Sequence, residues 1–386
     1  MGFPDALSAY ATALHTAIGT EHHVASPLGA WVVLALAAPA ATGAERATIE
    51  EVLGEPADEA AERAAALLAE PHPLVAAAAA LWARESVPTD WATGVQKGPL
   101  PSQAEADAWA SENTRGLIDA FPLTLTPEVV LVLASALGTD VSWTVPFETT
   151  TAEALGDSEW AGELTTALRA PSGHTVRIVA DDEAGDVVVH STEAKPLEGW
   201  SDGLTVVSVI GAPDVPASAV LAAAHRAALH GVHGQSLFDL PLGEGHAWTI
   251  TEEDAPTRTE SGREEAYDAV LPAWTASSDH DLLADASLGF DAAGSAVAGL
   301  IGPGLGIGAR QVARAEYTRV GFRAAAVTAM AWMTSAPPAP RPGIRRTATV
   351  RFGRPYAVVA VARQHGGPWH GVPVFSAWVA EPSDAS

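Results

Sequence analysis

Hydrophobic residues recur at three- and four-residue steps from residue 5 to about residue 90, in a stretch rich in alanine, leucine and valine. This spacing gathers apolar side chains on one face of a helix, so the N-terminal quarter is predicted to be mostly helical. Farther along the chain, continuous apolar runs that are too short for helices predict buried strands. These runs are residues 129–133, 187–189 and 204–210.

The second half of the chain mixes helical and strand patterns. Residues 216–229 have helical spacing and begin at Pro216, a residue that suits the start of a helix. Residues 252–268 are charged and rich in turn-forming residues, and are predicted to be a solvated surface connection. Two apolar runs, 356–362 and 374–380, are separated by Gly and Pro residues and predict a buried hairpin. The whole pattern indicates an α+β protein.

One segment is compatible with two structures. Residues 321–335 run from a glycine through an alanine-rich stretch towards a proline-rich one. Alanine is the best helix former, so local propensity leaves a helix open. A β-strand is equally open, because at period two every second side chain falls on the same face. That face would carry Phe322, Ala324, Ala326, Thr328, Met330 and Trp332, and the prolines at 337, 338, 340 and 342 would stop the strand.

Composition bounds the class of protein. The chain has 386 residues, of which 48% are hydrophobic, so it can bury a large core. No Gly/Ser-rich linker or internal repeat divides it, so residues 1–386 are predicted to form one domain. The longest apolar runs are too short to cross a bilayer. The chain has no cysteines and no visible signal peptide, so we expect a cytoplasmic protein, or an extracellular one if a leader has been removed.

Charge limits the possible partners. The formal net charge of −26 argues against binding to nucleic acids or anionic membranes. Acidic residues are absent between Glu316 and Glu381, whereas that span holds eight arginines. Either this basic segment packs against an acidic body, or it presents a basic bait loop to a partner.

No motif for catalysis or metal binding stands out. The chain lacks a Gly-x-Ser-x-Gly elbow, an HExxH motif, a cysteine pair and a P-loop. The pairs His22–His23 and His230 with His233 lack an acidic or third imidazole partner, so they are predicted to be surface or capping histidines. The sequence therefore predicts no enzyme, no metal site and no cofactor.

Short motifs spread over most of the chain form an ordered set. They are Ser26-Pro27-Leu28, Thr42–Glu45, Ile49–Gly54, Trp109 with Thr114, Gly116 and Ile118, Trp143–Phe147, Leu271-Pro272 through Asp281-Leu282 to Leu288-Gly289, the glycine and alanine run Gly321–Thr328, Arg354-Pro355-Tyr356 and Val374–Pro382. Their order and spacing resemble those of the serpin family. Residues 150–265 match this pattern poorly.

The resemblance implies the serpin fold, with three β-sheets, eight to nine helices and an exposed reactive-centre loop at about residues 317–346. In serpins the native fold is metastable: a serine protease attacks the loop and forms an acyl-enzyme, and the cut loop then inserts into the main sheet as an extra strand. Insertion drags the protease along and distorts its active site. The resemblance therefore implies a monomeric suicide inhibitor of a serine protease, with no catalytic residues of its own.

The resemblance also assigns site residues. The loop hinge comprises Gly321, Phe322, Arg323, Ala324, Ala325, Ala326, Val327 and Thr328. The residues around the sheet opening are Ser26, Ser135, Gln311 and Trp143. Counting forward from Gly321 predicts a reactive bond at Ser335–Ala336. Counting back from Pro355 predicts one near Arg345–Arg346 instead, which would suit a trypsin-like or dibasic-cleaving protease.

Departures from the family pattern leave a second function open. Phe322 stands where inhibitory serpins carry a small residue, and overpacking a core costs about 1–3 kcal/mol. The polar group at the sheet opening is reduced, because Ser135, Gln311 and Gly29 replace the family's Asn, His and Ser. The alternative is a non-inhibitory serpin-fold protein that serves as a binding or scaffold module.

Overall fold

The computed structural model describes residues 2–200, 203–302, 307–322 and 341–385. These residues form eight α-helices: α1 (Phe3–Ile18), α2 (Pro27–Ala37), α3 (Gly43–Leu53), α4 (Ala57–Ala69), α5 (Gln103–Asn113), α6 (Glu159–Glu163), α7 (Ala217–His230) and α8 (Phe290–Ile301). Short 3₁₀ turns lie at Ala38–Ala40, Ala152–Leu155 and Ala286–Leu288. Within the described ranges, none of the helices has the length and apolar character needed to span a membrane.

The strands of the N-terminal half are β1 (His23–Ala25), β2 (Val75–Ala83), β3 (Gln96–Pro99), β4 (Leu131–Thr139), β5 (Val141–Ser142), β6 (Glu148–Thr151), β7 (Thr166–Arg169), β8 (Thr175–Asp181) and β9 (Gly185–Glu193). The C-terminal half adds β10 (Gly203–Ile210), β11 (Gly243–Glu244), β12 (Trp248–Thr257), β13 (Arg263–Leu271), β14 (Trp274–Asp281), β15 (Arg310–Tyr317), β16 (Gly321–Phe322), β17 (Arg341–Arg351), β18 (Tyr356–Arg363) and β19 (Pro373–Val379).

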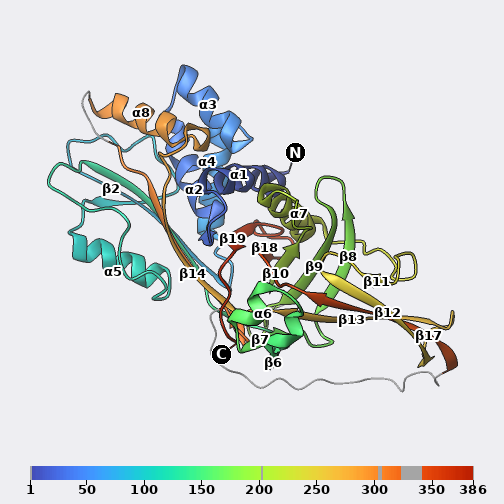
Figure 1. Cartoon of the computed structure of the whole chain (residues 1–386). Helices are drawn as coiled ribbons and strands as arrows, with labels where there is room; N and C mark the ends of the chain where they lie inside the picture. Colours follow the sequence, from blue (N-terminus) through green and yellow to red (C-terminus); the bar gives the residue numbers. More distant parts are fainter. Residues whose placement is uncertain (1, 201–202, 303–306, 323–340, 386) are drawn as a thin grey trace.

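The described strands pair into four hydrogen-bonded groups, two of which follow one another through β4 and β5 and together form the main sheet. The main sheet has two parts, ordered β14-β15-β16-β5 and β3-β2-β4, and only Asp140 separates β4 from β5 along the chain. The second sheet has the order β1-β19-β18-β10-β9-β8, and the third has the order β11-β12-β17-β13-β7-β6. Figure 1 shows helices α1 to α4 and α8 gathered at one end of the molecule, while β12, β13 and β17 extend away from it on the other side.

The core lies where the second sheet packs against the N-terminal helices. The hairpin β18–β19 is buried along almost its whole length, which is why both strands are continuous apolar runs. Helix α2 is apolar on all sides because it packs against α1, α4, β4 and β19. The predicted strands in β4, β9, β10, β18 and β19 and the predicted helix α7 are confirmed.

Two predictions of local structure are wrong. Residues 75–83 form β2 and not a helix, because pairing with β4 in the main sheet outweighs the helix propensity of the alanines. Residues 252–268 are not a loose connection, since most of them belong to β12 and β13, and both strands pair with β17. Their acidic residues lie opposite arginines: Glu252 pairs with Arg346, and Glu253 with Arg345. Opposite charges facing each other across strands stabilise such a polar sheet.

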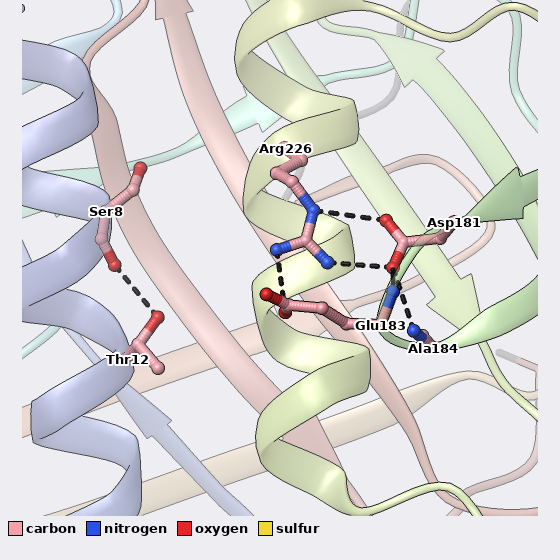
Figure 2. Close-up of polar contacts among 6 residues, drawn as sticks. All are labelled: Ser8, Thr12, Asp181, Glu183, Ala184 and Arg226. Carbon is pink, nitrogen blue, oxygen red and sulfur yellow. Dashed lines mark hydrogen bonds and ion pairs between the residues drawn. The ribbon is translucent and has the colours of Figure 1, made fainter.

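Helix α7 is attached to the hairpin formed by β8 and β9 through one arginine. Arg226 donates hydrogen bonds to both carboxylate oxygens of Asp181, at 3.1 and 2.8 Å, and to Glu183 at 3.0 Å (Figure 2). Asp181 also accepts a hydrogen bond from the backbone N–H of Ala184, which closes the turn of the hairpin. The neighbouring residue on α7, His225, is buried in the core.

Candidate functional site: an opening in the main sheet

Among the described residues, no strand fills the main sheet between β4 and β15 beyond the short β16 at one end. In the described part of the chain, β4 pairs with β2 and β15 pairs with β14, and no hydrogen-bonded ladder joins β4 directly to β15. Both strands line a cavity of about 230 Å³, together with helix α8. The cavity wall is mostly apolar and includes Val132, Ala134, Phe290, Ile307 and Val312. Two facing strand edges of this kind can accept one further strand between them.

The first two hinge residues already occupy one end of this opening. Gly321 pairs with Ser142 of β5, and Phe322 pairs with Val141 of β5 and with Tyr317 of β15. The short strand β16 therefore joins β15 to β5, which follows β4 along the chain. The other hinge residues, 323–328, lie outside the described residues, as do both residues of the predicted bond at 335–336.

Phe322 fits into the sheet without the predicted clash. Its side chain is 4% exposed, and its ring centroid lies 6.2 Å from that of Trp274 in an edge-to-face arrangement. Aromatic pairs favour this geometry over direct stacking. The ring is therefore accommodated before any further part of the loop inserts, and its size is no obstacle at this position.

Trp143 holds the turn that leads into the hinge. Its backbone N–H donates a hydrogen bond to the carbonyl oxygen of Val320 at 2.9 Å, and its indole Nε1 donates to that of Thr318 at 2.9 Å. The N–H of Phe147 donates to the carbonyl oxygen of Arg319, also at 2.9 Å. Three hydrogen bonds thus tie the segment from Trp143 to Phe147 to the three residues before the hinge.

Ser26, Gln311 and Ser135 come together around the start of α2, and we term them the latch. The Gln311 amide brackets the backbone of Ser26: Oε1 accepts from the Ser26 N–H at 2.9 Å, and Nε2 donates to the Ser26 carbonyl oxygen at 2.8 Å. Ser26 Oγ donates to the carbonyl oxygen of Val374 at 2.9 Å and caps α2 by accepting from the N–H of Gly29. Ser135 Oγ donates to the carbonyl oxygen of Gly29 at 2.8 Å. The latch therefore connects β15, α2 and β4.

The substitution Gln311→Ala is expected to destabilise the native protein by about 2 kcal/mol. It leaves the buried N–H of Ser26 without a partner, and Ser26 is 5% exposed, so water cannot replace the lost bond. Arg310→Ala on the same strand is the control, because its ion pair with Asp279 is exposed and contributes under about 1 kcal/mol. Denaturant unfolding measures both variants. Equal effects would mean that the latch does not support the native sheet.

The C-terminal end of the predicted loop belongs to a sheet. Residues 341–346 lie in β17, which pairs with β12 on one side and with β13 on the other, so this part of the predicted loop at 317–346 is a strand. Arg345 forms an ion pair with Glu264 at 3.2 Å, and Arg346 forms one with Glu252 at 2.8 Å. A protease needs an extended, unpaired chain around the bond it cuts. The structure therefore favours the basic segment packing on an acidic body over cleavage at Arg345–Arg346.

The sequence did not predict that histidines gather in the core. His15 lies 2.6 Å from His23 (Nδ1 to Nε2) and 2.6 Å from the Ser376 hydroxyl (Nε2 to Oγ). This row resembles a nucleophile with its base, but all three side chains are at most 3% exposed, so no substrate can reach them. The surface position predicted for His23 is wrong. His22 has the predicted capping role, since it accepts a hydrogen bond from the N–H of Ala380.

A second histidine pair, the partly buried His174 and the buried His190, lies beside the segment from Trp143 to Phe147. The His174 Nδ1 and His190 Nε2 atoms are 3.0 Å apart. Burial lowers the pKa of both imidazoles below the ordinary value. The two residues are 16 positions apart, and no motif links them, so only the packing of β8 against β9 could reveal the pair.

The three sheets, the opening in the main sheet and the chain segment that leads from this opening into the third sheet define the serpin fold. The protein therefore has this fold, as the sequence motifs predicted. No family model matches the chain, and no curated protein matches it either. Comparison with solved structures does find similar proteins, and these have the serpin fold.

The crystal structure of tengpin, a thermophilic serpin, in its native state matches 98% of this chain and 94% of its own, with a TM-score of 0.62 and 13% identity. The Arabidopsis serpin AtSerpin1, in its native stressed conformation, matches 99% of both chains, with a TM-score of 0.58 and 16% identity. Human thyroxine-binding globulin also matches 99% of both chains, with a TM-score of 0.61 and 12% identity. At these identities the likeness concerns the fold alone.

Proposed function

We propose that this protein inhibits a serine protease by acting as a suicide substrate. The protease cuts the segment between β16 and β17, and the acyl-enzyme moves with the cut segment as it inserts between β4 and β15. The observation that carries the proposal is the position of Phe322, which pairs with strands on both sides of an otherwise open sheet. The protease performs the chemistry, and this chain supplies the loop and the opening.

The register of β16 predicts where each loop residue would lie after insertion. If the register continues unbroken, Thr328 falls opposite Ser135 of β4 and Gln311 of β15. Its hydroxyl group could then exchange hydrogen bonds with two members of the latch. In the same register Ala326 falls opposite Ala313, which is buried. The predicted inward face of the loop would therefore meet the buried face of β15.

The length of the opening supports a reactive bond at Ser335–Ala336. In this register Trp332 falls opposite Leu131, the first residue of β4. A protease acylated at Ser335 would thus end past the far end of β4, at roughly 43 Å from Phe322 along a strand that rises about 3.3 Å per residue. Since serine is a small residue, we infer a target protease with a small specificity pocket and not a trypsin-like one.

Incubation with a panel of serine proteases tests this proposal. An elastase-type protease is expected to form a covalent complex that survives boiling in detergent, with the acyl bond at Ser335 located by mass spectrometry. Ser335→Arg should transfer complex formation to trypsin, whose pocket carries an aspartate for basic side chains. A protease that lacks its active-site serine is the control. If every protease cuts the loop and none is trapped, the protein is not an inhibitor.

A second candidate function is binding without inhibition. The opening holds an apolar cavity of about 230 Å³ beside the polar latch, and one protein of similar fold is by its name a thyroxine-binding globulin. Under this alternative a cut loop stays outside the sheet. The stability of the protein before and after cleavage then remains the same, which separates the two functions.

A further inference from the structure

A buried histidine, His190, and a partly buried one, His174, support the segment that holds the hinge. His190 lies in β9, and His174 immediately precedes β8. The Nε2 atom of His174 is 2.7 Å from the carbonyl oxygen of Val145 and 3.1 Å from Oγ1 of Thr192. Val145 is the middle residue of the segment from Trp143 to Phe147. The histidine pair is therefore one hydrogen bond away from the residues that hold the turn before the hinge.

The hydrogen bonds determine where the protons lie in this pair. A carbonyl oxygen only accepts, so His174 Nε2 carries a proton and donates it to Val145. In a neutral imidazole the other nitrogen, His174 Nδ1, must then accept, and His190 Nε2 donates to it at 3.0 Å. His190 Nδ1 therefore has a free lone pair. Among the described residues this buried atom has no hydrogen-bond partner, so it is the site at which the pair can take up a proton.

The surroundings of His190 are mostly apolar, apart from His174 and the hydroxyl-bearing Ser208. The rings of Phe147 and Phe352 lie 5.5 and 6.5 Å from its ring, measured between centroids. Val176 of β8 and Ser208 of β10 are its partners across the strands. Burial is the main cause that lowers the pKa of His190, followed by the charge of His174, the one ionisable group of the described chain that acts on it. No carboxylate is thus present to stabilise an imidazolium there.

A proton on His190 would disturb the hinge support through two contacts. The imidazolium would have to donate from Nδ1, where no acceptor is available in the described structure, so the ring has to move towards water. Movement withdraws the donor from His174, whose other nitrogen holds Val145. It also removes the packing of His190 against Phe147, whose N–H donates to Arg319 in the turn before the hinge.

We propose that the pair His174–His190 is a pH-sensitive control of the loop hinge: a proton taken up at Nδ1 of His190 loosens the segment from Trp143 to Phe147 and speeds insertion of the loop. The predicted loosening of this segment depends only on contacts between described residues. The effect on insertion rests on the proposed function.

Hydrogen exchange of the intact protein between pH 8 and pH 5 tests the loosening. After correction for the intrinsic pH dependence of exchange, protection of the Trp143 and Phe147 amides should fall by about tenfold or more in the wild type. A tenfold fall is expected when loosening of the segment raises the pKa of His190 by one unit. His190→Gln keeps an N–H donor for His174 but cannot take up a proton, so its protection should stay constant. His230→Gln, at an exposed site, should behave like the wild type.

Equal loss of protection in the wild type and in His190→Gln would overturn the proposal, and so would no loss in the wild type. If His190→Gln does not fold, ¹⁵N-histidine NMR of the wild type decides, because protection must stop falling at the pH where native His190 becomes protonated. The rate at which cleaved protein gains stability should also rise at acid pH in the wild type only. If cleaved protein gains no stability at any pH, the proposed function fails, and hydrogen exchange still tests the histidine pair.

Discussion

Cleavage of the loop at Ser335 is expected to raise the Tm of this protein by roughly 10 °C or more. The cut segment gains hydrogen-bond partners on both sides when it pairs with β4 and β15, and each bond contributes about 0.5–1.5 kcal/mol net. Ordering the segment costs about 1–2 kcal/mol of conformational entropy per residue. Each inserted residue gains two hydrogen bonds, and the apolar side chains fill the cavity. The free energy of these two contributions together exceeds the entropic cost. Calorimetry of intact and cleaved protein measures the change.

The substitution Ala326→Glu is expected to abolish this rise. If the cut loop inserts in the register of β16, residue 326 would lie opposite Ala313, which is 1% exposed, so the carboxylate would be buried without a partner. Burying an unpaired charge costs several kcal/mol. Ala325→Glu is the matched control, because in the same inserted register residue 325 would fall on the other face, opposite the exposed Arg314. If both variants gain the same stability on cleavage, the loop does not insert in this register.

Acidification is expected to destabilise the native protein by about 6 kcal/mol between pH 6.5 and pH 4. Burial lowers the pKa of His23 and that of His225 to about 4, whereas an unfolded chain keeps the ordinary value of about 6.5. Between these values the unfolded state binds more protons, so stability that is fully present above pH 6.5 is lost as the pH falls. Each of the two histidines accounts for a loss of about 3 kcal/mol of stability, since its pKa is lowered by about 2.5 units and each unit corresponds to about 1.36 kcal/mol. Denaturant midpoints at pH 7.5, 5.5 and 4.5 measure the loss.

The substitution His225→Leu is expected to retain about 2–3 kcal/mol of the stability that the wild type loses at pH 4.5. Neither ring nitrogen of His225 has a hydrogen-bond partner in the described structure, so leucine removes no bond. His230→Leu on the same helix is the control, because that side chain is 62% exposed. It should leave the pH dependence of the wild type unchanged. A wild-type pH dependence in His225→Leu as well would rule out His225 as a source of acid sensitivity.

The hydrophobic pattern predicted local structure well where burial is uniform. The hairpin β18–β19 lies within one residue of its predicted bounds, because strands buried on both faces need continuous apolar runs. Helix α7 begins directly after Pro216, as predicted. The pattern failed for β2, whose alanines favour a helix until β4 is present. It also failed for β12, whose acidic residues suit a strand only because arginines of β17 lie opposite.

In the candidate site, too, some features could be predicted from the sequence and others could not. The order of the motifs predicted that Ser26, Ser135 and Gln311 belong together, and the structure connects them through hydrogen bonds around the start of α2. The end of the loop could not be predicted by counting residues, because it depends on where β17 begins to pair. That position is determined by contacts of Arg345 and Arg346 with acidic residues more than 80 positions away.

By itself, the sequence determined the α+β class, the ordered serpin motifs and the alternation at 321–335, because these depend on the spacing of neighbouring residues. Only the tertiary structure decided that the described strands leave β4 and β15 unpaired with each other, that Phe322 fits against Trp274, and that His174 and His190 meet beneath the hinge. Each of these features is a contact, or a missing contact, between residues far apart in the chain. Packing creates such contacts, and local propensity does not encode them.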